Sequence, residues 1–348
     1  MIRNRYITLG VLVAFITPVF VEADTSHLHR TNGTQPITLD ADSTLRDYLA
    51  FAALNNVGLQ SAFNRWKASL EAVQQAGVLP DPKFNYGYFI QSVETRVGPQ
   101  NQRFGISQTF PWLGKLKLQE EASMAMANMA QQRYESAKVS LFDEVKQSYF
   151  DYYYLGKSIS ITAESVSLLK DFERIARSKY ESGSALYADL LKAQVELDEI
   201  TDRLKTLQER IPPMVARFNA ALSREAAAPL PLPSEIVSFN SQIDGQRLIK
   251  ELRKMNPDLR TIDYLEEKEV AGIRIAKKEY YPNITFGIDV VETESALLSG
   301  GADSGKDAVM VGFSANLPIW RKKLKAGVAE AESRRLAAAR SRIDLENQ

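Results

Sequence analysis

The chain carries the stretch Asn56-Val57-Gly58-Leu59 and, 200 residues later, the related stretch Asn256-Pro257-Asp258-Leu259. The first opens a segment with helical spacing that ends at Leu79-Pro80-Asp81-Pro82, and the second opens one that ends at Tyr280-Tyr281-Pro282. After each proline the hydrophobic residues change from helical spacing to the two-residue alternation of a strand. A repeat of such long period has to be recognised before local patterns are interpreted, and it predicts a duplicated structural unit.

A second pair of related stretches lies downstream. Phe104-Gly105-Ile106-Ser107 leads to Pro111, and Val311-Gly312-Phe313-Ser314 leads to Pro318. A segment with helical spacing follows both prolines, so the repeated unit is helix–strand–strand–helix. We assign the domains in this order: first repeat 44–226, Ala- and Pro-rich linker 227–243, second repeat 244–348.

The composition excludes several kinds of site. The 348 residues include 43 Lys and Arg and 43 Asp and Glu, so the formal net charge is zero and nothing favours nucleic acid as a partner. Without cysteine there are no disulfides, thiolate metal ligands, cysteine nucleophile or lipidated N-terminal cysteine. The only histidines are His27 and His29, in a polar N-terminal stretch. We therefore expect no enzyme activity, no cofactor and no metal site.

The N-terminus has the features of a secretory signal peptide. Basic residues precede an apolar run at 7–21, and small residues lead to a cleavage point after Ala23. The alternative is a membrane anchor, which is disfavoured because the run is too short to span a bilayer comfortably. We expect a signal peptide at 1–23 and a loose arm at 24–43. The exported chain is expected to lack transmembrane helices and to reach the periplasm or the outer membrane of a Gram-negative cell.

Four segments alternate between apolar residues and small or polar ones. They lie at about 83–92, 102–110, 283–292 and 308–317. Their length and alternation match the strands of an outer-membrane barrel, in which one face contacts lipid. A half-buried sheet of a soluble protein gives the same alternation, so the pattern alone does not distinguish the two. The candidate lipid-facing residues are Phe84, Tyr86, Tyr88, Phe104, Ile106, Phe286, Ile288, Val311 and Phe313.

Long helical segments connect these strands. We expect one helix from about Thr44 to Val78 and another from Lys115 to Ser182, which at 1.5 Å per residue would span roughly 100 Å. Ser182-Gly183-Ser184 predicts a turn, and Pro212-Pro213 predicts a kink or restart in the returning helix. That returning helix carries two interleaved heptad series, which indicate coiled-coil packing: Leu190, Leu197, Leu204, Ile211, Phe218 and Leu186, Ala193, Ile200, Leu207, Met214, Ala221.

Local motifs and their order resemble the TolC family of outer-membrane efflux proteins, from about Leu45 to the end of the chain. The motifs are Ser107-Gln108-Thr109-Phe110-Pro111 before Gly114-Lys115, Tyr180-Glu181-Ser182-Gly183 before Asp189-Leu190-Leu191, and Phe218-Asn219-Ala220-Ala221-Leu222 before the linker. The versions Leu79-Pro80-Asp81-Pro82 and Phe110-Pro111-Trp112-Leu113-Gly114-Lys115 look most like members that serve heavy-metal or multidrug resistance.

The resemblance implies a mainly α-helical protein with a small membrane β part. In the family three chains each give four strands to one 12-stranded barrel, and their helices form an α-barrel across the periplasm. The physics of lipid agrees on one point, because four strands cannot close a barrel and open sheet edges are not tolerated in a bilayer. The turn between the long helices is where an adaptor docks in the family. Here that turn, called the tip below, comprises Ser182, Gly183, Ser184, Ala185 and Leu186.

The function implied is that of an outer-membrane exit duct in a tripartite efflux or secretion system. It would passively conduct solutes, such as metal ions or drugs, from an inner-membrane pump and a periplasmic adaptor. Two alternatives are a periplasmic coiled-coil adaptor and a structural protein without channel activity. Adaptors place one helical hairpin centrally between β-rich flanks, whereas this sequence repeats helix–strand–strand–helix, and the four amphipathic strands disfavour a purely structural coiled coil.

One departure from the family pattern concerns the C-terminal end. The second long helix is expected to start near Arg321, and the sequence stops at Gln348. By comparison with the first repeat, the rest of this helix, its turn and its returning helix would be missing. We therefore expect the sequence to be C-terminally truncated, with the gating residues of the family in the missing part.

Overall fold

The structure is a computed structural model, and it describes residues 39–347 except 41, 234–235, 237–243 and 298–300. The predicted signal peptide at 1–23, with His27 and His29, lies outside the described residues. So does most of the predicted arm at 24–43 and the second half of the predicted linker.

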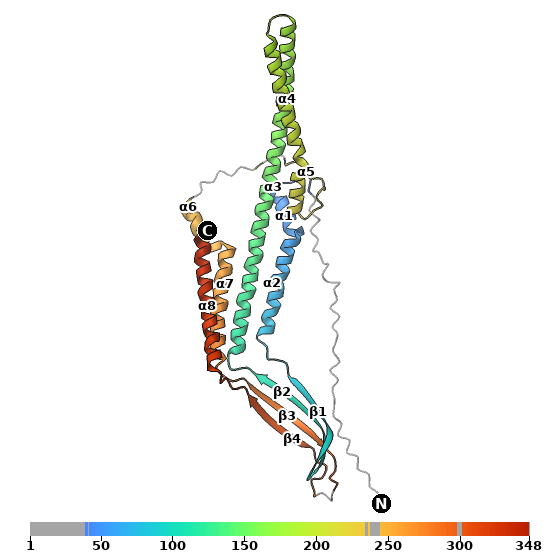
Figure 1. Cartoon of the computed structure of the whole chain (residues 1–348), viewed down its shortest axis with the longest axis vertical. Coiled ribbons are helices and arrows are strands. Elements are labelled where there is room, and N and C mark those ends of the chain that lie inside the picture. Colours follow the sequence, from blue (N-terminus) through green and yellow to red (C-terminus); the bar gives the residue numbers. More distant parts are fainter. Residues whose placement is uncertain (1–38, 41, 234–235, 237–243, 298–300, 348) are drawn as a thin grey trace, which may run out of the picture. The chain divides into compact units, whose positions relative to one another are not determined.

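The described residues form a mainly helical structure with one small sheet, in the order predicted from the two repeats (Figure 1). None of the described helices has a stretch that is long and apolar enough to cross a lipid bilayer. The helices are α1 Leu45–Asn55, α2 Val57–Ala76, α3 Lys115–Glu181, α4 Tyr187–Glu209, α5 Ile211–Ala221, α6 Gly245–Met255, α7 Pro257–Lys278 and α8 Arg321–Asn347. The strands are β1 Lys83–Thr95, β2 Gly98–Phe110, β3 Ile284–Thr293 and β4 Ala308–Ala315.

The strands form one antiparallel sheet in the order β1-β2-β3-β4. Strands β1 and β2 come from the first repeat and pair with each other, and β3 and β4 do so in the second. The two halves join where β2 pairs with β3, and Ile106 lies opposite Ile288 in that register. The sheet therefore unites the two repeats, and β1 and β4 form its outer edges.

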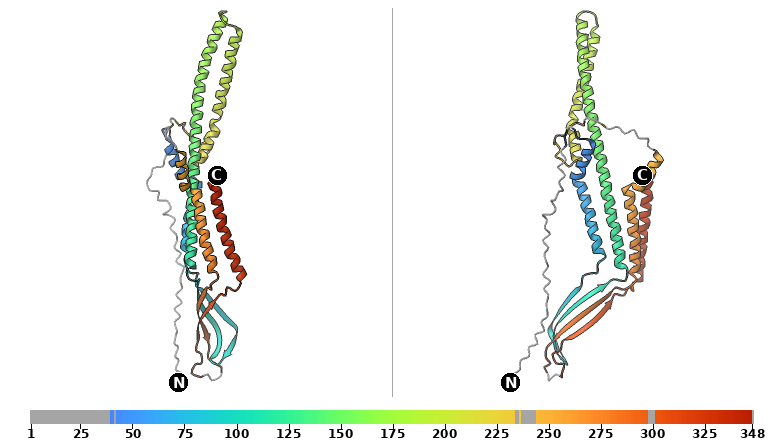
Figure 2. Two further views of the ribbon diagram at one scale, coloured as in Figure 1. Left: turned by 90° about the vertical axis from the view of Figure 1, so that its left-hand side faces the viewer. Right: turned by 180° about the vertical axis from the view of Figure 1, so that it is seen from behind.

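Helix α3 is the central element of the helical part. It packs against α2 and α7 in its first part and against α4 in its last part, and α8 packs against α7. Figure 2 allows the α3–α4 hairpin and the α7–α8 pair to be followed from two further sides. The two heptad series predicted for α4 and α5 are buried or half-buried along their length, with Leu190, Phe218 and Ala221 fully buried. Leu186 at the tip is the exception.

The predicted interruption at Pro212-Pro213 is confirmed, because α4 ends at Glu209 and α5 restarts at Ile211. Proline is tolerated in the first turn of a helix, where its missing N–H would have no intrahelical acceptor. The long helix predicted from Lys115 is also present and contains 67 residues.

One helix prediction was wrong, and one helix was missed. The helix expected from Thr44 to Val78 is broken at Asn56, whose backbone is extended with ψ 115°. The Asn56 side chain caps α2 by accepting a hydrogen bond from the Leu59 N–H at 2.9 Å, and it also donates to the Ala221 carbonyl at 3.1 Å. Helix α6 was not predicted at all, although Asp244 caps its first turn.

The main hydrophobic core lies where α1, α3 and α5 meet. Tyr48 of α1 is 1% exposed and stacks on Phe218 of α5 with ring centroids 5.0 Å apart. Tyr149 of α3 meets Tyr48 edge to face at 5.5 Å. The Tyr152 hydroxyl donates to the Leu230 carbonyl at 3.0 Å, so a residue of the predicted linker is fixed to this core.

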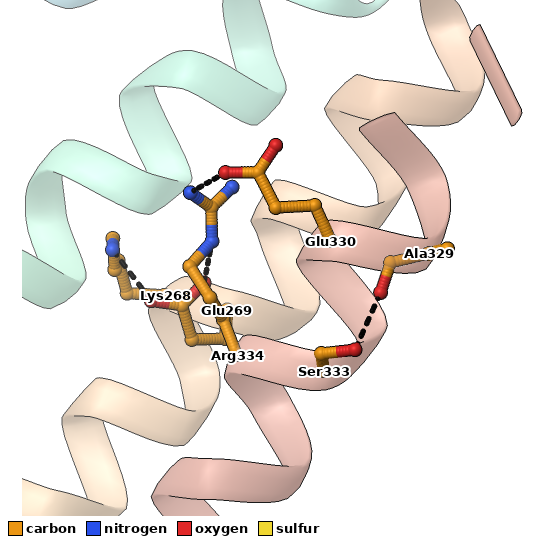
Figure 3. Close-up of polar contacts among 6 residues, drawn as sticks. All are labelled: Lys268, Glu269, Ala329, Glu330, Ser333 and Arg334. Atoms are coloured by element: carbon orange, nitrogen blue, oxygen red, sulfur yellow. Dashed lines mark hydrogen bonds and ion pairs between the residues drawn. The ribbon is translucent and has the colours of Figure 1, made fainter. Parts of the chain in front are cut away.

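Helices α7 and α8 are held together by ion pairs around a buried carboxylate (Figure 3). Glu269 is 4% exposed. Its carboxylate forms ion pairs with Lys268, at 2.6 Å between Nζ and Oε1, and with Arg334, at 3.4 Å between Nε and Oε2. Arg334 also binds Glu330 at 2.8 Å. A buried carboxylate is tolerated only when charge and hydrogen bonds compensate for lost hydration, so this network ties α8 to α7.

The core tyrosines predict a loss of stability at alkaline pH. Burial raises the pKa of Tyr48 to about 12, and burial also raises the pKa of Tyr149 and Tyr152. Between pH 10 and 12 the unfolded chain loses the Tyr48 proton while the folded chain keeps it, so the free energy of unfolding falls as pH rises. Tyr48 contributes about 3 kcal/mol to this fall in the free energy of unfolding. Chemical denaturation should therefore show that the free energy of unfolding falls less between pH 8 and pH 11 in Tyr48→Phe than in wild type. Equal losses would contradict the prediction.

Candidate functional site

The register of the sheet separates two faces. One row across all four strands contains Phe84, Ile106, Ile288 and Val311. The next apolar row contains Tyr86, Phe104, Val290 and Val309. A third brings Phe286 opposite Phe313. The first two rows consist of apolar side chains, whereas in the third Phe286 also lies opposite Gln108, so this face of the sheet is largely apolar.

All nine candidate lipid-facing residues lie on this apolar face and are exposed in the single chain. Phe104 is the least exposed at 39%, and Phe313 is the most exposed at 78%. A sheet face that packed against a soluble core would be buried. The chain leaves this large apolar surface open to its surroundings, which favours a nonpolar environment outside it.

The opposite face of the sheet is polar and contains a paired charge. The Arg103 guanidinium binds the Asp289 carboxylate across β2 and β3 through two contacts of 3.0 Å each. Gly105 lies opposite Asp289, and a Cβ at position 105 would approach Asp289 Oδ1 to 2.2 Å. A side chain at position 105 would therefore require the Asp289 carboxylate to move. Sequence analysis missed this pair, because the alternation gives each residue a face but does not give the register between the two repeats.

The tip is ordered by a glycine in a left-handed backbone conformation. Gly183, just beyond the end of α3, has φ 76°, in the region that favours glycine. The Gly183 N–H donates to the Tyr180 carbonyl at 3.0 Å, and the Ser184 N–H donates to the Lys179 carbonyl at 2.8 Å. These two bonds form a Schellman cap, which turns the chain sharply at the end of the helix.

The tip contains two kinds of side chain: serines that hydrogen-bond to the end of α3, and an exposed apolar leucine. The Ser182 and Ser184 hydroxyls both donate to the Lys179 carbonyl, at 3.0 and 3.1 Å. Leu186 is 72% exposed at the start of α4, and its N–H donates to Asp189 Oδ2 at 3.3 Å. The serine side chains therefore stabilise the turn itself, whereas Leu186 exposes an apolar side chain beside it. Ala185 lies between them and is half-buried.

The hairpin behind the tip is held together by a polar link between α3 and α4. Gln194 of α4 donates to Glu173 Oε1 of α3 at 3.2 Å, and Arg177 donates to the same oxygen at 2.5 Å. These hydrogen bonds hold the pKa of Glu173 below its ordinary value, with Arg177 as the larger cause. Nearer the end, the rings of Tyr180 and Tyr187 lie 5.6 Å apart.

Within the described ranges, no cluster of three or more His, Asp or Glu side chains is arranged to hold a metal ion. The sites that the structure does build are the apolar face of the sheet and the tip of the α3–α4 hairpin. A small sheet with an exposed, largely apolar face joined to long helices is the kind of arrangement found in outer-membrane channel subunits.

Comparison with known proteins gives a family match over part of the chain. Residues 50–212 match the family model described as outer membrane efflux protein. The chain is 25% identical over 315 residues to Nodulation protein T of Rhizobium leguminosarum bv. viciae. That alignment covers 86% of this chain and 63% of the relative, so the chain spans less than two thirds of the relative's length.

Solved structures share the fold. The outer membrane protein VceC from Vibrio cholerae superposes with a TM-score of 0.68 at 16% identity, over 87% of this chain and 75% of that one. A membrane protein from Pseudomonas aeruginosa superposes with a TM-score of 0.71 at 17% identity, over 89% and 76% of the respective chains.

The fold is thus that of TolC-like outer-membrane channels. Residues 50–212 of the chain also match the outer membrane efflux protein family. The resemblance predicted from the sequence motifs is confirmed, as are the mainly α-helical fold class and a location in the outer membrane with the helices in the periplasm. The proteins that the chain matches are outer-membrane efflux proteins and channels, which are not enzymes.

Proposed function

We propose that the chain is a subunit of a homotrimeric exit duct. The observation that carries this proposal is the open sheet with one apolar face. Strand β1 pairs only with β2, and β4 pairs only with β3, so each edge of the sheet has a row of backbone groups without a partner strand. Such edges are too costly in lipid, and pairing β4 of one copy with β1 of the next removes them.

The polar face of the sheet supports a water-filled lumen in this trimer. It carries Arg103 and Asp289 as a closed ion pair, together with small residues such as Gly87 and Gly312. Outer-membrane barrels place apolar side chains toward lipid and polar ones toward the lumen. The duct would therefore conduct solutes by diffusion, without a binding pocket of its own. Its cargo would be metal ions or drugs delivered by an inner-membrane pump.

The tip would be the docking point for the periplasmic adaptor of that pump. The Schellman cap at Gly183 fixes the shape of the turn, and Leu186 provides an exposed apolar contact beside it. Nothing in the described chain offers a phosphate-binding loop, so the energy for transport would come from the pump. A periplasmic adaptor and a structural coiled coil remain the alternatives, and neither explains the exposed apolar face of the sheet.

The absence of cysteine allows a clean test of the trimer. Gly87 of β1 and Gly312 of β4 lie on the polar face of the two edge strands, and a Cβ at either position meets no atom within 4 Å. In cells carrying Gly87→Cys/Gly312→Cys, a short bis-maleimide should give a covalent trimer on denaturing gels of outer-membrane fractions. Each single variant should stay monomeric. A double variant that reaches the outer membrane and yields only monomer, or an open-ended ladder, would contradict the closed trimer.

A further inference from the structure

The junction between β4 and α8 exposes apolar and basic side chains together. We call residues 317–325 the β4–α8 junction; they read Leu317-Pro318-Ile319-Trp320-Arg321-Lys322-Lys323-Leu324-Lys325. Leu317 and Trp320 are each 73% exposed, and Ile319 is 63% exposed. A shallow hollow in this surface is lined by Ile319, Trp320, Arg321, Lys322 and Lys323.

The lysines of this junction lack a counter-charge. Lys322, Lys323 and Lys325 are exposed, and none of them forms an ion pair with a carboxylate of the residues that the structure describes. The Arg321 guanidinium lies over the Tyr280 ring at 5.8 Å. The first turn of α8 contains no acidic residue. Cations at the positive end of a helix dipole are unfavourable, so an anionic partner would stabilise this arrangement.

At the equivalent junction of the first repeat, the tryptophan and the first lysine have partners within the chain. Trp112 stacks on Tyr281, with ring centroids 4.8 Å apart and an interplanar angle of 11°. Lys115, the first residue of α3, pairs with Glu279 at 2.7 Å. By contrast, Trp320 has no ring partner among the described aromatic residues. Within the described chain, the tryptophan and the first lysine are therefore paired at the first junction, where Leu113 is exposed, and lack a ring or carboxylate partner at the second.

The charge of the sheet also differs between its two ends. The β4–α8 junction has four basic residues and no acidic one. At the other end of the strands, the described residues at 94–96, 292–297 and 301–307 carry more acidic than basic side chains. The acidic ones are Glu94, Glu292, Glu294, Asp303 and Asp307. A basic end next to exposed tryptophan is the pattern of a surface that contacts anionic headgroups.

From this arrangement we infer that the β4–α8 junction binds the headgroups of anionic phospholipids at the periplasmic surface of the outer membrane. The inference rests on the proposed function, because it requires the apolar face of the sheet to lie in the bilayer. Leu317, Ile319 and Trp320 continue that face beyond the end of β4, and indole side chains favour the interface. The lysine side chains next to them reach headgroup phosphates with their ammonium groups while their stems cover apolar surface.

Fluorescence quenching by brominated lipids tests this site. The full chain is reconstituted in vesicles of three parts phosphatidylethanolamine to one part phosphatidylglycerol, with the bromine on one lipid or the other. Emission of Trp320 is isolated by subtracting the spectrum of Trp320→Phe, which retains Trp66 and Trp112. Wild type should be quenched preferentially by brominated phosphatidylglycerol, and the preference should weaken at high salt.

Charge variants then test which residues cause the preference for phosphatidylglycerol. Each lysine near an anionic surface contributes about fivefold, so Lys322→Gln/Lys323→Gln/Lys325→Gln should lower the preference by about 100-fold. The matched control is Lys250→Gln/Arg253→Gln/Lys254→Gln, which removes the same charge from exposed positions of α6 and should leave the preference unchanged.

The remaining outcomes distinguish a failure of the proposed lipid site from a failure of the proposed duct. Quenching of equal strength by both lipids, independent of salt, would overturn the inference and leave the duct standing. A similar loss in the α6 control would overturn the assignment to the junction. If neither lipid quenches Trp320, the placement of the sheet in the membrane is wrong as well. The salt titration of wild type decides the question even where a triple variant does not fold.

Discussion

Export should fall to background in Gly183→Pro, while the chain still assembles in the outer membrane. Proline holds φ near −65°, whereas Gly183 has φ 76°, and proline also removes the N–H that donates to the Tyr180 carbonyl. The loss of this cap and the local strain cost about 1–3 kcal/mol each, confined to the last turn of α3 and the first turn of α4. The core around Tyr48 and Phe218 lies on other elements and should stay intact.

The control for this variant is Gly183→Asn. Asparagine tolerates the left-handed region and keeps the backbone N–H, and a Cβ at this position meets no atom within 4 Å. We expect Gly183→Asn to export solute at a rate close to wild type. The measurements are resistance to an exported compound and co-purification of the adaptor, each normalised to the amount of outer-membrane trimer. Normal export by Gly183→Pro at normal abundance would remove the tip from the docking role.

Replacing Val311 by arginine should prevent stable insertion of the sheet. Val311 lies in the middle of β4 on the apolar face, in the row with Phe84, Ile106 and Ile288. An arginine facing lipid near the bilayer midplane costs about 2–4 kcal/mol, and a trimer carries that cost three times. We therefore expect Val311→Arg to disappear from the outer membrane and to be degraded or to aggregate.

The neighbouring residue provides the matched control. Met310 is on the same strand but on the polar face, because successive side chains of a strand point to opposite sides. Met310→Arg should still yield outer-membrane trimers, with its guanidinium in the lumen. The readout is the yield of heat-modifiable trimer in outer-membrane fractions. Comparable loss of both variants, or normal insertion of both, would contradict the assignment of the two faces.

The sheet and the coiled coil were predictable because their patterns are local and periodic. A two-residue period places Phe84 and Tyr86 on one face whatever the register, and a seven-residue period identifies Leu190 and Phe218 as packed residues. The register itself depends on contacts between distant segments. For this reason the pairing of Arg103 with Asp289, and the close approach of Gly105 to that carboxylate, could not be obtained from alternation.

The errors at Asn56 and α6 have different causes. The break at Asn56 is fixed by its bond to the Ala221 carbonyl, a contact across 165 residues that no local pattern reveals. Helix α6 did have a readable signal, since Leu248, Ile249, Leu252 and Met255 recur at helical spacing behind the capping Asp244. The tip was recognisable because Ser-Gly-Ser between two helical patterns indicates a capped turn. The distinction between its capping serines and its exposed Leu186 required the hydrogen bonds.

The two open edges of the sheet have a consequence for biogenesis. Before insertion, a single exported chain would present β1 and β4 as unpaired templates beside a largely apolar face, which is the combination that drives strands to aggregate. Mutual pairing of three copies and entry into lipid bury both hazards together. Folding of the sheet should therefore be coupled to assembly, and the chain should depend on periplasmic holdase chaperones until three copies meet at the membrane.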